Sequence, residues 1–182
     1  MTIVEFLRPH FQRLHQSQEQ AIQDLTPEEF HWLPTGNGNH IAFTMWHSVR
    51  TEDNMIRFVL QNRRPTIWLE NGWNEKFGLD RIAQGTGMSH DDATDVRFPS
   101  VADFTGYMQD VWRATEEYLA SLKDEDLGQV VTIKPRGEFT VGNALQEIVL
   151  THQFSHLGEI WALRGLQGLQ GTGNLDSLPR GI

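Results

Sequence analysis

The stretch "SVADFTGYMQDVWRATEEYLASL", residues 100–122, decides the fold of this 182-residue chain. Ser100 and Asp103 form the polar start that favours a helix N-terminus. Mostly apolar side chains then recur at alternating spacings of three and four, as along the seam of a helix packed in a bundle. The seam consists of Val101, Phe104, Met108, Val111, Thr115, Tyr118 and Leu122.

Three other segments have the same helical periodicity. The first helix is expected over residues 3–25, and a capping box that starts at Thr26 predicts a short helical turn after it. The second helix is expected over residues 41–61 and the fourth over residues 140–166. Together the segments predict an all-α four-helix bundle that forms a single domain over residues 1–182.

The connection between the second and third helices, residues 62–99, is too long for a turn. Its aromatic residues indicate an ordered cover over the bundle, and a long crossover here lets these two helices run parallel. The aromatic residues are Trp68, Trp73 and Phe77. Residues 130–139 are expected to form a short extended connection, and the glycine-rich residues 167–182 a loose C-terminal tail.

The composition excludes several functional classes. A net charge of −9 and a pI of about 5.3 argue against a nucleic-acid partner, because an acidic surface repels phosphates. The absence of cysteine excludes disulfides and protein thiolates. Residues 1–16 do not resemble a signal peptide, and no apolar run reaches the ~18–20 residues that span a bilayer. We therefore expect a cytoplasmic protein without a membrane partner.

The glycine motifs "GNGN" (36–39) and "GTG" (85–87) lack the spacing of nucleotide-binding loops. No strand is expected before either of them. Both are therefore interpreted as turns.

Two histidines stand four residues apart in "THQFSHLGEIWALRG", residues 151–165. On a helix His152 and His156 are about 40° apart and separated by a rise of about 6 Å, so both imidazoles can reach one metal ion. Glu159 falls close to the same line. A buried polar group without a partner costs roughly 1–3 kcal/mol, and a divalent cation is a partner that imidazoles share. The helix is expected to face inward through Leu145, Ile148, His152, Ser155, Glu159, Ala162 and Leu166.

A third ligand must come from another helix, and His47 in "FTMWHSVRTED" is the candidate. Asp53 lies on the apolar stripe of the same helix, where its carboxylate could orient a ligand imidazole or a bound water. The other five histidines are interpreted as structural. Three are placed at helix surfaces or ends (His10, His15, His31), one in a loop (His40) and one after a helix cap (His90).

A second apolar stripe is expected on the opposite side of the last helix. It contains Leu150, Phe154, Leu157 and Trp161. Either residues 62–99 or another helix cover it, or it forms a subunit interface.

The histidines and their surroundings resemble the DinB-like superfamily. The resemblance rests on "IAFTMWHSVRTEDNMI" (41–56), "GWNEKFGL" (72–79), "GTGMS" (85–89) and "HQFSHLGEIWALRGLQG" (152–168). It implies a four-helix bundle with a long crossover after the second helix, and often a homodimer. It also implies a metal site with three histidine ligands, which fall on His47, His152 and His156. Relatives include metal-dependent S-transferases that use low-molecular-weight thiols, and thiol-dependent maleylpyruvate isomerases.

The resulting expectation is a divalent-metal-dependent enzyme, with zinc or nickel as the ion and a small-molecule substrate. The resemblance ranks thiol-dependent S-transfer ahead of hydrolysis. Because the chain has no cysteine, any thiol must arrive as a cosubstrate. The alternatives are a non-catalytic metal-binding or stress-response module and a metal-free helical dimer whose polar seam fixes the register. Glu159 is open to three roles: a fourth ligand, a base, or a polar partner of His156.

Overall fold

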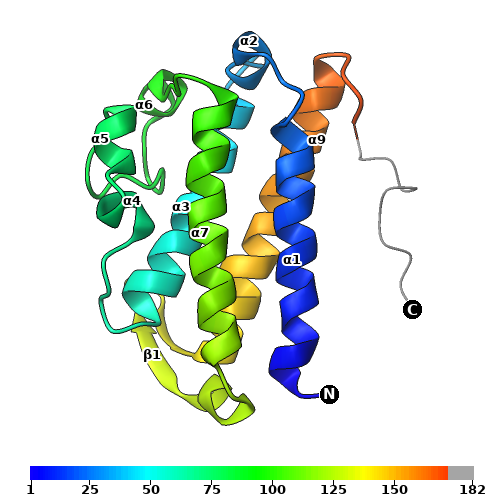
Figure 1. Ribbon diagram of the computed structural model, residues 1–182. Helices are drawn as coiled ribbons and strands as arrows, with labels where there is room; N and C mark the ends of the chain where they lie inside the picture. The colour runs from blue at the N-terminus through cyan, green and yellow to red at the C-terminus, as the bar shows by residue number, and fades with distance from the viewer. Residues whose placement is uncertain (172–182) are drawn as a thin grey trace.

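The computed structural model of the protein describes residues 1–171, in which four long helical segments form the body of the molecule (Figure 1). They are α1 (Ile3–Ile22), α3 (Ile41–Asp53) with its π-helical continuation η1 (Asn54–Val59), α7 (Val101–Ser121), and α8 (Val141–Asn143), which continues through the π-helix η3 (Ala144–Thr151) into α9 (His152–Leu166). The shorter elements are α2 (Pro27–Phe30), α4 (Ile67–Glu70), α5 (Trp73–Phe77), α6 (His90–Asp95), the 3-10 helix η2 (Asp124–Gly128), β1 (Val130–Ile133) and β2 (Gly137–Thr140).

The long helices form a four-cornered bundle. Helix α1 packs against α7 and α9, and α3 packs against the same two helices, so α1 and α3 occupy opposite corners. Helices α1 and α9 run upward in Figure 1, whereas α3 and α7 run downward. The parallel course of α3 and α7 follows from the long crossover between them. The structure confirms the predicted all-α four-helix bundle.

The helices begin where the sequence signals place them. Ser100 Oγ accepts the backbone N–H of Asp103 at 3.0 Å and caps α7. Thr26 and Glu29 form the predicted capping box in front of α2, and Thr140 caps α8. Such caps satisfy N–H groups that a helix start would otherwise leave without acceptors.

The crossover carries α4, α5 and α6, and its aromatic residues pack into the bundle. Trp68 is fully buried against Trp46 and Tyr107. Asp53, at the end of α3, accepts the backbone N–H groups of Ile67 and Trp68 at 2.8 and 2.9 Å. This buried carboxylate therefore attaches the start of α4 to the bundle.

The expected extended connection is the antiparallel hairpin β1–β2. Its register pairs Val130 with Thr140 and Ile133 with Gly137. Strand β1 also contacts η1. The hairpin turn, residues 134–136, consequently lies beside the C-terminal end of the second long helix.

The last long helix differs from its predicted register. Up to Ile148 the expected inward positions are buried, but Ser155, Glu159, Ala162 and Leu166 are exposed. The buried positions of α9 are Gln153, Leu157, Ile160 and Arg164. The cause is η3, because a π-helix places more residues in each turn than an α-helix and advances the buried face along the sequence. The histidines therefore lie beside the core rather than within it.

The second apolar stripe of the last helix is partly covered. Leu150 and Leu157 are buried, whereas Phe154 remains 40% exposed. Leu150 and Phe154 line a shallow groove with Phe6 and Leu7 of α1. The neighbouring helix, rather than residues 62–99, forms the other side of this groove.

Helix α9 ends in a Schellman motif at Gly168, which has a φ of +76°. Leu169 N–H bonds to Arg164 O at 3.0 Å and Gly168 N–H to Gly165 O at 3.0 Å. The predicted loose tail lies outside the described residues from position 172 onward. None of the described helices combines the length and apolar character required to cross a membrane.

Candidate metal centre

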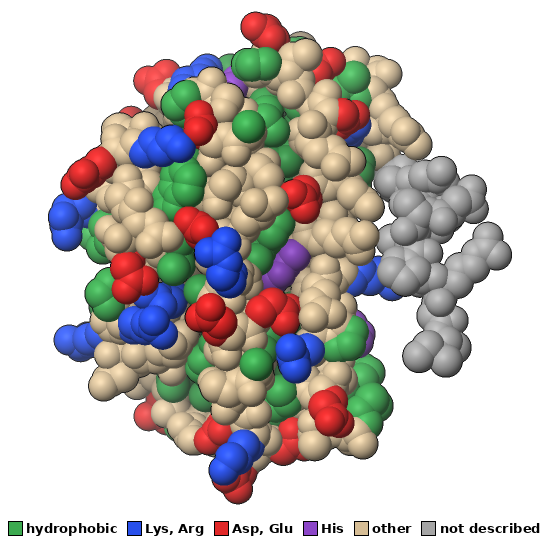
Figure 2. Space-filling view, viewed as in Figure 1, with side chains coloured by type: hydrophobic (Ala, Val, Ile, Leu, Met, Phe, Trp, Pro, Cys, Tyr) green, Lys and Arg blue, Asp and Glu red, His purple; other side chains and the backbone are tan. Residues whose placement is uncertain are grey.

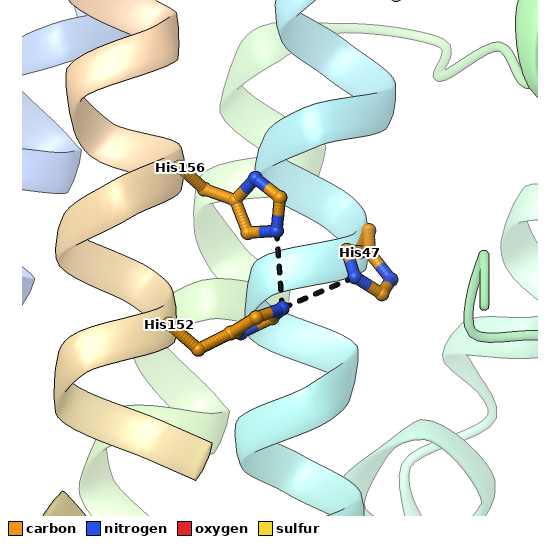
Figure 3. Close-up of side chains that lie close together, drawn as sticks. All are labelled: His47, His152 and His156. Carbon is orange, nitrogen blue, oxygen red and sulfur yellow. Dashed lines mark hydrogen bonds between the residues drawn. The ribbon is translucent and has the colours of Figure 1, made fainter. Parts of the chain in front are cut away.

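The imidazoles of His47, His152 and His156 converge between α3 and α9 (Figure 3). Nε2 of His152 lies 3.3 Å from Nε2 of His47 and 3.0 Å from Nε2 of His156. One candidate ligand atom from each residue falls within 4.8 Å of the others. All three side chains are half-buried. The structure thus brings together the three histidines that the sequence singles out.

His47 is oriented by the loop that follows α5. Its Nδ1 lies 2.6 Å from Gln84 O, and because a carbonyl oxygen only accepts, Nδ1 carries the hydrogen. Nε2 of the neutral ring therefore presents a lone pair to the other histidines. The ring also stacks on Phe43 with an interplanar angle of 9°. This is the arrangement in which a backbone carbonyl fixes the tautomer of a ligating histidine.

Gly85 allows this close contact between the loop and His47. Its φ is +85°, and a Cβ at this position would lie 3.0 Å from His47 Nδ1 and 3.1 Å from the Phe43 ring. The "GTG" stretch was interpreted as a plain turn, but its first glycine lies against a candidate ligand. The sequence signal for this role was available only from the resemblance, since a short glycine motif is common in turns.

His156 is oriented in the same way by Glu159. Its Nδ1 donates to a Glu159 carboxylate oxygen at 2.7 Å, which leaves Nε2 as the acceptor. The Glu159 side chain is 59% exposed and approaches the ring from outside the cluster. Of the three roles left open for Glu159, the structure displays that of polar partner to His156.

His152 lies between the other two histidines. Burial, together with the charges of His156, His47 and Arg136, lowers its pKa to about 4, and burial also lowers the pKa of His47. Nδ1 of His152 is buried and has no hydrogen-bond partner among residues 1–171. The lowered pKa values mean that His47 and His152 are neutral at pH 7. The Nε2 atoms of His47 and His156 are directed at Nε2 of His152.

This donor set fits a divalent transition-metal ion. Two nitrogens bound about 2.1 Å from one ion at angles near 90–109° are about 3.0–3.4 Å apart. The two measured separations of 3.0 and 3.3 Å fall in that range. Neutral imidazoles suit zinc, nickel and related ions. The cluster of His47, His152 and His156 could therefore hold a metal ion.

In the described chain the hydrogen bonds of Asp53 involve none of the three imidazoles. It is fully buried, and besides the two N–H groups of α4 it accepts from Arg50 at 3.0 Å and from Tyr107 at 3.1 Å. Burial raises the pKa of Asp53, an effect that the charge of Arg50 opposes. Arg50 also donates to Ala83 O at 3.0 Å, next to the carbonyl that binds His47. Asp53 thus supports the loop behind His47 rather than the imidazole itself.

A cavity of about 840 Å³ opens beside the three histidines. This volume suits a small molecule. The walls are formed by α3, η1, the loop at residues 84–87, the hairpin β1–β2 and η3. They include Asn39, Phe43, Thr51, Asn54, Met55, Phe58, Val59, Asn62, Arg63, Gln84, Gly85, Thr86, Gly87, the segment 131–136 and Ile148.

A second polar cluster, which we term the core polar cluster, lies inside the bundle around Glu52. The Glu52 carboxylate accepts from His15 Nε2 at 3.0 Å, from Thr115 Oγ1 at 2.5 Å and from Gln153 Nε2 at 2.6 Å. His15 is 6% exposed, so its expected position at a helix surface is wrong. The sequence signal was the polar break around Gln18, which is also buried and donates to Gln153 Oε1 at 2.9 Å.

Comparison with known proteins places the chain in one family. The sequence pattern of the DinB superfamily matches residues 10–160. The crystal structure of a conserved protein from Enterococcus faecalis is similar, with a TM-score of 0.79 and 23% identity over 91% of this chain and 97% of that chain. At this identity the likeness concerns the fold. No curated protein is significantly similar to the chain in sequence. The family match covers most of the chain, including His47, His152 and His156, and the chain therefore belongs to the DinB superfamily.

Proposed function

We propose that the protein binds a divalent transition-metal ion, zinc or nickel, through Nε2 of His47, His152 and His156 and is a thiol-dependent S-transferase. The observation that carries the proposal is the convergence of three imidazoles, with 3.3 Å between Nε2 of His47 and His152 and 3.0 Å between Nε2 of His152 and His156. A divalent ion held there supplies Lewis acidity, which lowers the pKa of a bound thiol or water.

The protein's own residues prepare the ligands. Gln84 O and the Glu159 carboxylate each hold an Nδ1–H, so that the opposite nitrogens face one point without rearrangement. Such support around a metal ligand is typically worth 10–100-fold in affinity or activity. In this role Glu159 fixes the orientation of the His156 ring.

A thiol cosubstrate is consistent with both the sequence and the cavity. The chain contains no cysteine, so a nucleophilic sulfur must come from another molecule. The cavity beside the histidines, about 840 Å³, has room for a small thiol and its acceptor together. The proposed cytoplasmic location is a reducing compartment in which such thiols persist.

Metal analysis tests the binding site directly. After incubation with zinc or nickel and removal of free ions, we expect about one ion per chain in the wild type. His152→Ala should retain less than about a tenth of an equivalent, because two imidazoles alone form a weak site. His10→Ala, which removes an exposed histidine from α1, is the matched control and should bind metal normally. A wild type without bound metal would refute the proposal.

An activity assay separates the enzyme from a non-catalytic metal-binding module. Metal-loaded protein is mixed with a low-molecular-weight thiol and monochlorobimane, an electrophile whose thiol adduct fluoresces. We expect turnover that requires the metal and is lost in His152→Ala. Turnover that survives in this variant would reject the site. Full metal loading with no turnover across a panel of thiols would favour the non-catalytic module.

The same family resemblance leads us to propose a homodimer. Light scattering at several protein concentrations tests this point. A molar mass equal to one chain throughout would contradict it.

A further inference from the structure

Three cationic side chains line the cavity beside the histidines, and we term Arg63, Lys134 and Arg136 the cavity cations. No Asp or Glu of the described chain is among the lining residues. This differs from the protein as a whole, in which 24 acidic residues outnumber 15 basic ones. The carboxylate next to the cluster, Glu159, contacts the outer nitrogen of His156 and does not line the wall.

The cavity cations have no partners within residues 1–171. They take part in no ion pair there and in no side-chain hydrogen bond, whereas Arg8 pairs with Glu116 and Arg57 with Glu70. Figure 2 shows that acidic and basic side chains are interspersed over the face formed by α1 and α7. The cavity is thus a place where three cations gather and no acidic side chain lines the wall.

Their positions bring the cavity cations to one end of the cavity. Lys134 and Arg136 lie in the turn of the hairpin β1–β2, Arg63 follows η1, and β1 contacts η1. Arg63 has a φ of +63°, a left-handed conformation that a long side chain rarely adopts and that introduces backbone strain. Strained residues of this kind tend to occur at binding sites.

The cations, which are exposed, and the histidines line the same open cavity. Arg136 and His152 are both among the residues that line it. Apolar side chains, including Phe58, Val59 and Ile148, form the wall of this space. A ligand that fits it has an anionic end, an apolar middle and a reactive group at the histidines.

We infer that the small molecule accepted by this cavity carries a carboxylate, which the cavity cations bind while its reactive group faces His47, His152 and His156. The inference rests on the proposed function, which it extends by naming the class of substrate. Guanidinium groups bind carboxylates through paired hydrogen bonds, and lysine adds a point charge. The carboxylate belongs either to the thiol cosubstrate or to the acceptor of its sulfur.

Calorimetric titration with matched ligands tests the inference on the full chain, with and without zinc. One pair is 3-mercaptopropionate and its amide, and the other is fumarate and fumaramide. We expect the wild type to bind the acid of at least one pair about tenfold more tightly than the amide, as a charge-assisted hydrogen bond predicts. The pair with the larger preference shows whether the thiol or its acceptor carries the carboxylate.

Two double variants separate the cavity cations from general charge effects. Lys134→Gln with Arg136→Gln should reduce the preference for acids to less than about threefold, since the charge-assisted bonds are lost. Arg113→Gln with Lys123→Gln removes two exposed cations outside the cavity and should leave the preference unchanged. Equal binding of acids and amides by the wild type, or a preference that the first double variant retains, would overturn the inference.

The titrations without zinc separate carboxylate binding by the cavity cations from carboxylate binding by a metal ion. A preference for acids that is present without zinc and depends on Lys134 and Arg136 supports the inference, even if the protein takes up no metal and the proposed function fails. A preference that appears only with zinc and ignores both residues overturns the inference and leaves the metal site intact.

Discussion

The core polar cluster and the candidate metal centre both use residues of α3 and α9 but differ in how their hydrogen bonds are satisfied. Adjacent residues of α9 separate them, since Gln153 faces Glu52 and His152 faces His47. In the core, the Glu52 carboxylate accepts hydrogen bonds from three side chains of the protein. At the centre, the three Nε2 atoms face one another, and Nδ1 of His152 has no partner in the described chain. A buried carboxylate bonded in this way stabilises the fold, whereas converging imidazole nitrogens are suited to a cation.

The largest expected effect comes from breaking the core polar cluster. Glu52→Ala should lower the free energy of unfolding by about 3–5 kcal/mol. The substitution leaves three buried groups without their acceptor: the imidazole of His15, the hydroxyl of Thr115 and the amide of Gln153. Chemical denaturation of metal-free protein measures this. Glu75→Ala on the exposed face of α5 is the control. If His152→Ala proved as destabilising as Glu52→Ala without metal, the contrast between the clusters would be wrong.

Metal addition should stabilise the fold through the other cluster. At a free zinc concentration 100 times the Kd, the wild type should gain about 2.7 kcal/mol in unfolding free energy, and a chelator should reverse the gain. Thermal melting with and without zinc provides the measurement. His152→Ala should show little gain, while Glu52→Gln, if folded, should still respond. If zinc still stabilised His152→Ala, the ion would have to bind at another site.

Gly85→Ala should weaken metal binding without removing a ligand. Its Cβ would press on His47 Nδ1 at 3.0 Å, so we expect a loss of about 10–100-fold in metal affinity, the range for residues that support ligands. Competition with a metal-sensitive dye measures the affinity. Gly87→Ala is the matched control, because its φ is +76° but no atom lies within 4 Å of the added Cβ. Equal losses in both variants would indicate loop strain rather than displacement of His47.

The smallest effect concerns acid stability. Burial by itself raises the pKa of Glu52, but the charge of His15 and the hydrogen bonds from His15, Thr115 and Gln153 outweigh it and lower the pKa below 4.5. The folded protein therefore releases this proton more readily than the unfolded chain. The resulting stability is present above pH 4.5 and is lost as pH falls through the folded pKa, by up to about 1.4 kcal/mol per pH unit.

Glu52→Gln isolates this contribution. Denaturation series between pH 3 and 7 should show a shallower loss of stability on acidification in the variant than in the wild type. Identical slopes for the two proteins would show that folding does not shift the pKa of Glu52.

The fold could be predicted from the sequence because its signals are local. Ser100, Thr26 and Thr140 mark helix starts through bonds to residues three positions later, and the seam of α7 repeats with the α-helical period. The prediction of the buried face was wrong in α9, because the helical period changes in the preceding segment η3. The π-helical segment 144–151 is not announced by any residue type, so the buried face of α9 was expected one position too early.

The candidate site was predictable in part for a similar reason. His152 and His156 are close in sequence, and the resemblance pointed to His47. The contributions of Gln84 and Gly85 depend on where the loop at residues 84–87 meets α3, which no periodicity indicates. The prediction for His15 was wrong because its partner Glu52 lies on another helix. In the sequence, two polar residues that pair inside the core cannot be distinguished from two residues at the surface.

The π-helix η3 also makes the bundle sensitive to chain length within its last long helix. A π-helix can be regarded as an α-helix with a residue inserted. Deleting a single residue between Ala144 and Thr151 would favour an ordinary α-helix there and turn α9 by roughly 100° relative to the hairpin. After such a deletion the side chains of α9 would point in new directions. His152 could then no longer face His47 while Gln153 faces Glu52.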